Sequence, residues 1–70
     1  MDDRTRRLYD ARRAGLVARI ASEGVGTERV ERAFDAWEEE AYSRGLSRLE
    51  SRFWTDAPAW IREEAENRRH

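Results

Sequence analysis

Few residues in this sequence carry the side chains that nucleophilic or general-base catalysis requires. The chain has no cysteine and a single histidine, His70 at the C-terminus, and all of its basic residues are arginines. Hydroxyl groups are present, but activating one requires a nearby base that titrates close to neutral pH. A helical chain of 70 residues forms no deep cleft that would raise the pKa of a carboxyl group. We therefore predict that this protein is not an enzyme.

A group of acidic residues on one predicted helix is the next candidate for chemistry. Glu31, Asp35, Glu38 and Glu39 fall on neighbouring turns, as the ligands of a carboxylate metal site would. Metal sites in helical bundles, however, use glutamates and histidines that point inward from several helices. These four acids are predicted to face solvent, opposite Trp37, so we expect no metal and no cofactor. We predict instead that this acidic face binds a basic surface of a partner.

The segment Gly24–Phe34 indicates an alternative function. Its sequence, GVGTERVERAF, resembles the turn and recognition helix of GntR-type winged-helix repressors. In that family a Gly-Val-Ser/Thr turn leads to a valine and then to an Arg-Ala-Leu-like step. Val30 and Arg32-Ala33-Phe34 take those places here, and Gly45-Leu46 is similar to the exit before the wing. The resemblance implies a nucleic-acid-binding regulator of helix-turn-helix type.

The charges of this segment disfavour DNA as the partner. Glu28, Glu31 and Asp35 lie on the would-be recognition helix, where they would repel the phosphates that dominate DNA affinity. The formal net charge of −1 is far from the basic footprint of a DNA-binding domain. No β-hairpin pattern follows the helix. Nucleic acid is therefore the less favoured partner, although the arginines of the first helix could contact a phosphate backbone.

Helical periodicity along the chain predicts an all-α fold, a compact three- or four-helix bundle that forms a single domain over residues 1–70. Helices are expected at about 3–22, 27–44, 48–54 and 57–67. The second helix has the clearest pattern, because its apolar residues recur on one stripe. They are Val30, Ala33, Phe34, Trp37 and Ala41.

Short-range signals predict where the helices begin and end. Asp2 or Asp3 suits the N-cap of the first helix, and Thr27 suits that of the second. Gly24 and Gly45 suit the left-handed position that closes a helix, with Leu46 placed for the accompanying apolar contact.

Two further signals concern the last part of the chain. Ser47 and Glu50 have the spacing of a capping box that would begin the third helix. Pro58 predicts a break, with Asp56 as a new N-cap, because proline removes one helix hydrogen bond. A single kinked helix is the alternative, since Leu49, Phe53, Ala57 and Trp60 still share one arc.

Trp54 differs from the other aromatic residues of the chain. Phe34, Trp37, Phe53 and Trp60 all lie on stripes that predict a core. Trp54 points about 100° away from the Phe53 stripe. It is either an exposed interface anchor or is turned inward by a bend before Pro58.

The distribution of charge suggests the kind of partner. Residues 1–22 carry six arginines and three aspartates, a balance of +3, whereas residues 23–41 carry seven acids and two arginines, a balance of −5. The first helix of one copy could therefore pair with the second helix of another. No stretch has the length of a membrane span or the character of a signal peptide, so we expect no membrane partner and a cytoplasmic location. The exclusive use of arginine is typical of a GC-rich bacterial or phage gene.

These observations predict a small non-catalytic interaction module or regulator. It would bind a protein partner, or a second copy as a homo-oligomer, through the acidic helix face and an apolar patch at Trp54.

Overall fold

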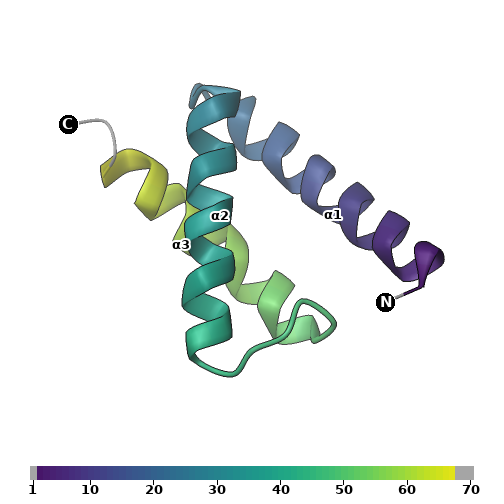
Figure 1. Ribbon diagram of the computed structural model, residues 1–70. Helices are drawn as coiled ribbons and strands as arrows, with labels where there is room; N and C mark the ends of the chain where they lie inside the picture. Colours follow the sequence, from purple (N-terminus) through teal and green to yellow (C-terminus); the bar gives the residue numbers. More distant parts are fainter. Residues whose placement is uncertain (1, 68–70) are drawn as a thin grey trace.

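The computed structural model describes residues 2–67, which form three helices. They are α1 (Asp3–Ala21), α2 (Thr27–Ser43) and α3 (Ser51–Asn67), and no strand occurs within these residues. Figure 1 shows α3 crossing α2, while α1 meets α2 near their connecting turn and diverges from it toward the N-terminus. The all-α prediction is confirmed, with three helices and not four.

The core is formed mainly between α2 and α3. Its largest fully buried side chains are those of Trp37, Phe34, Phe53, Ile20, Ile61 and Val30. The predicted stripe of α2 is buried along its whole length. From α1, only Val17 and Ile20 are buried. The first half of α1 therefore receives little support from the core.

The ends of α1 and α2 follow from local hydrogen bonds. Asp2 is the N-cap of α1, since its Oδ1 accepts a hydrogen bond from the Thr5 amide at 2.8 Å. That bond lowers the pKa of the Asp2 carboxyl group. Gly24 and Gly45 have φ values of 100° and 75°, so both adopt the predicted left-handed conformation. The Leu46 amide donates to the Ala41 carbonyl at 2.8 Å, and its side chain packs against the core as expected.

The cap of α2 differs from the expectation. Gly26, not Thr27, occupies the N-cap position, and no side chain caps this helix end. Thr27 is instead its first residue.

The third helix is continuous through Pro58, so the predicted break at Asp56 is wrong and the single-helix alternative is correct. Proline lacks the amide that would donate to the Trp54 carbonyl, but its fixed φ is compatible with a helix. The buried residues continue at four-residue spacing on both sides of it: Phe53, Ala57, Ile61 and Ala65. Packing of this uninterrupted stripe against α2 offsets the missing hydrogen bond.

Ser47 and Glu50 form a turn before α3 that resembles half of the predicted capping box. Glu50 Oε2 accepts from the Ser47 amide at 2.6 Å, as predicted. Ser47 Oγ, however, accepts from the Leu49 amide at 3.1 Å, while the Glu50 amide donates to the Ser47 carbonyl at 3.0 Å. The helix therefore begins at Ser51. Leu49 lies in the turn and is 68% exposed, so its assignment to the core arc was wrong.

The turn provides a prediction about local stability. Ser47→Ala and Glu50→Ala should each lower the free energy of unfolding by about 0.5–1 kcal/mol, because each removes a hydrogen bond to an otherwise free amide. The double variant should lose less than the sum, since both bonds hold one turn. Chemical denaturation of the four proteins in a double-mutant cycle measures this difference. Full additivity would show that the two bonds act independently.

Candidate interaction surfaces

Trp54 lies against α1 and forms the edge of the core. Its ring centroid is 5.7 Å from that of Tyr9, 6.0 Å from Phe34 and 5.0 Å from Phe53. Its indole N–H donates to the Arg48 carbonyl at 2.8 Å. The side chain is half-buried, so the expectation of an exposed anchor is wrong. The physical reason is that α1 covers the side of α3 that α2 leaves free.

The four residues of the predicted acidic face of α2 are not equally exposed, because α1 lies beside one of them. Glu31, Asp35 and Glu39 are exposed. Glu38, in contrast, has only 18% of its side chain exposed. Arg13 on α1 accounts for this difference, because its Nη1 donates to Glu38 and its Nη2 donates to Asp35 at 2.9 Å. Part of the charge on α2 is therefore neutralised within the chain.

Three arginines stack on the aromatic rings at the junction of the helices. The guanidinium of Arg13 lies 4.5 Å from the Phe34 ring centroid, and that of Arg12 lies 5.0 Å from Trp54. Arg48, in the turn before α3, lies 4.4 Å from the Tyr9 ring. Such cation–π contacts combine with the ion pairs to hold α1, whose apolar contacts are few.

The hydroxyl group of Tyr9 is buried inside this junction. It forms no hydrogen bond of good geometry with another of the described residues, although the Glu38 carboxylate is close enough to act on it electrostatically. Burial, followed by the effect of Glu38, raises the pKa of Tyr9 from 10.0 to about 12. The charged form of this side chain is thus disfavoured where α1 meets the other helices.

This shift predicts a loss of stability at alkaline pH. Unfolded chains release the tyrosine proton near pH 10, whereas the folded protein retains it until about pH 12. The free energy of unfolding therefore falls as the pH rises from about 10 to about 12. Tyr9→Phe should remove that part of the loss, as measured by urea unfolding of both proteins across the same pH values. If the free energy of unfolding falls equally with pH in wild type and variant, the burial of the Tyr9 hydroxyl is contradicted.

Arg13 also allows a test of how α1 is held. Arg13→Ala should lower the free energy of unfolding by roughly 1–3 kcal/mol, because it leaves the mostly covered Glu38 carboxylate without its partner. The control is Arg52→Ala, whose ion pair with Asp56 is long, at 3.7 Å, and largely exposed. That variant should change stability by less than about 0.5 kcal/mol. Denaturation curves showing equal effects for the two variants would exclude a special role for Arg13.

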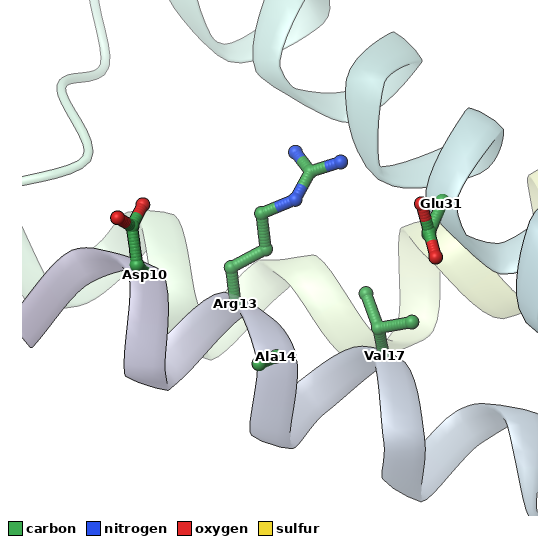
Figure 2. Close-up of a pocket in the computed structure, with 5 residues that line it drawn as sticks. All are labelled: Asp10, Arg13, Ala14, Val17 and Glu31. Atoms are coloured by element: carbon green, nitrogen blue, oxygen red, sulfur yellow. The ribbon is translucent and has the colours of Figure 1, made fainter. Parts of the chain in front are cut away.

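A pocket of about 230 Å³ lies between α1 and α2. It is lined by Asp10, Arg13, Ala14, Val17 and Glu31. Figure 2 shows Arg13 extending from α1 toward α2, with Glu31 on the opposite side. The lining contains two carboxylates and one guanidinium, which can bind charged groups but include no thiol, imidazole or hydroxyl nucleophile. Within residues 2–67, no three His, Cys, Asp or Glu side chains gather closely enough to hold a metal ion.

The winged-helix resemblance lacks its wing in the structure, as the sequence predicts. Gly45 and Leu46 lead into the turn before α3, and no β-hairpin is present in the described part of the chain. The helix–turn–helix of α1 and α2 is present, but α2 carries its acidic residues outward. None of the described helices has the length and apolar character needed to span a membrane.

Among the described residues three large apolar side chains are exposed, and the sequence patterns did not identify them as surface features. They are Leu8, Tyr42 and Leu49. Leu8 lies on the side of α1 opposite the buried Val17, a position that helical spacing alone would have revealed.

Comparison with models of known families, with curated proteins and with solved structures finds no match for this chain. Its function is therefore inferred from its own residues.

Proposed function

We propose that this protein is a small, non-catalytic interaction module that acts as a regulator by binding a basic protein surface. The contact would be made by the acidic outer face of α2, defined here as Glu31, Asp35 and Glu39. The exposure of all three on a single helix is the observation that carries the proposal. A cytoplasmic location remains part of the proposal.

The rigidity of α2 supports this function. Five of its residues are buried, and its ends are fixed by the glycine turns that precede and follow it. A partner that binds the opposite face therefore meets side chains on a backbone that is already ordered, which lowers the entropic cost of binding. Neither Glu31 nor Glu39 forms an ion pair with another described residue, so both carboxylates are available.

Trp54 is no longer part of the proposed contact. Its assignment depended on exposure, and its ring is instead covered by α1.

A binding experiment with two probes tests the proposal. The probes are a fluorescent arginine-rich helical peptide and a generic DNA duplex, and anisotropy is measured at about 0.15 M salt. Wild-type protein should bind the peptide, and Glu39→Arg should weaken that binding about tenfold. The matched control is Glu63→Arg, which changes the same charge at an exposed position of α3.

Two outcomes would overturn the proposal. Equal effects of Glu39→Arg and Glu63→Arg would show that only net charge matters. Sub-micromolar binding of the duplex that falls steeply with salt would instead favour the helix-turn-helix alternative, with the arginines of α1 on the phosphates.

A further inference from the structure

The first half of α1 has an outer face that nothing else in the described chain covers. Arg4, Arg7, Leu8 and Ala11 are exposed and follow one another at helical spacing, on the side opposite Tyr9. Leu8 is 64% exposed. Figure 1 shows this half of the helix diverging from α2. The face combines a large apolar side chain with two arginines that form no ion pair within residues 2–67.

Gly15 continues the same face toward the C-terminal end of α1. A glycine in a helix interior is unfavourable compared with alanine, so it calls for a reason. No such reason is found among residues 2–67, because a Cβ atom built at Gly15 would meet no atom of theirs within 4 Å. The absence of a side chain here leaves room for another helix to approach the backbone.

The outer face of α2 has the complementary character. Asp35, Glu39 and Tyr42 lie on it at spacings of four and three residues, and Tyr42 is 50% exposed. Carboxylates bind guanidinium groups directly, and a tyrosine ring accepts one by stacking. The structure already contains this chemistry between the same two helices, where Arg13 of α1 binds Asp35 and Glu38 of α2.

We propose that the basic surface recognised by α2 is the outer face of α1 in a second copy of this chain. The two helices would lie antiparallel, with Arg7 opposite Glu39 and Arg4 opposite Tyr42. This register follows from the equal spacing of the two pairs and the common rise of α-helices. Leu8 would be covered by the contact. The formal net charge of −1 leaves little repulsion between copies to oppose it.

This inference rests on the proposed function and specifies its partner. A single contact joins two different faces and is therefore heterologous, whereas two such contacts formed together make an isologous pair. It closes as a dimer when both possible pairs form together, and it extends into longer assemblies when they do not.

Sedimentation velocity over a range of protein concentrations up to about 1 mM tests the inference. Wild type should associate, whereas Arg7→Glu and Glu39→Arg should each weaken association about tenfold. An equimolar mixture of these two variants should restore it, because the introduced glutamate then faces the introduced arginine. Arg52→Glu and Glu63→Arg, which make the same charge changes on α3, serve as controls and should associate like wild type.

Gly15→Ala adds a test that separates association from folding. This variant should melt at a higher temperature than wild type, since alanine favours the helix, and should nevertheless associate less tightly. Association that resists Arg7→Glu and Glu39→Arg would overturn the proposed contact.

A monomer at every concentration would also overturn it. If that monomer still binds the arginine-rich peptide through Glu39, the proposed function stands and only the identity of the partner is wrong. Loss of peptide binding as well would reject both.

Discussion

Trp37→Ala is expected to leave the domain unfolded or barely folded at 25 °C. The side chain is fully buried in the middle of α2, with ring centroids 5.5 Å from Phe53 and 5.6 Å from Trp60. Truncating a buried tryptophan costs roughly 3–5 kcal/mol. A domain of this size has a total stability of only about 5 kcal/mol. Circular dichroism during thermal and urea unfolding measures the loss.

Trp37→Phe provides the matched comparison. The indole N–H of Trp37 is buried and donates no hydrogen bond to any described residue, which carries a desolvation cost. Phenylalanine removes that donor while retaining much of the apolar volume, so this variant should be much more stable than Trp37→Ala. Melting of Trp37→Ala within a few degrees of wild type would show that the core is elsewhere. Equal instability of the two variants would show that the indole N–H has a partner.

Trp54→Ala is expected to lower the free energy of unfolding by roughly 2–3 kcal/mol. This is less than for a fully buried tryptophan, because the ring is half-buried. The variant loses the contacts with Tyr9 and Phe34 together with the hydrogen bond to the Arg48 carbonyl. Since α1 has few other contacts with α3, hydrogen exchange should show the greatest loss of protection in the first half of α1.

The control for Trp54 is Leu49→Ala, which removes an exposed side chain from the turn before α3 and should change stability by less than about 0.5 kcal/mol. Association of Trp54→Ala should be measured alongside, under conditions where the protein is folded. A variant with unchanged melting temperature and lost association would restore Trp54 to the role of an exposed anchor.

The sequence by itself determined those features that depend on neighbouring residues. The buried stripe of α2 and the left-handed glycines that follow α1 and α2 were predicted correctly, and Asp2 was one of the two residues predicted to cap α1. Each depends on hydrogen bonds or backbone preferences within about one helical turn, so the residues that decide it are adjacent in the chain. The outward position of Glu31, Asp35 and Glu39 follows in the same way, because it is fixed by the stripe on the opposite face.

The tertiary structure decided where elements meet. Pro58 breaks a helix on local grounds, but packing of the residues on both sides of it against α2 keeps α3 continuous. Trp54 lies outside the stripe of its own helix and is covered by Tyr9 from α1. Glu38 lies beside exposed acids in the sequence but is covered where Arg13 crosses to it. These outcomes depend on the angle at which one helix crosses another, and that angle is set by the combined packing of all three.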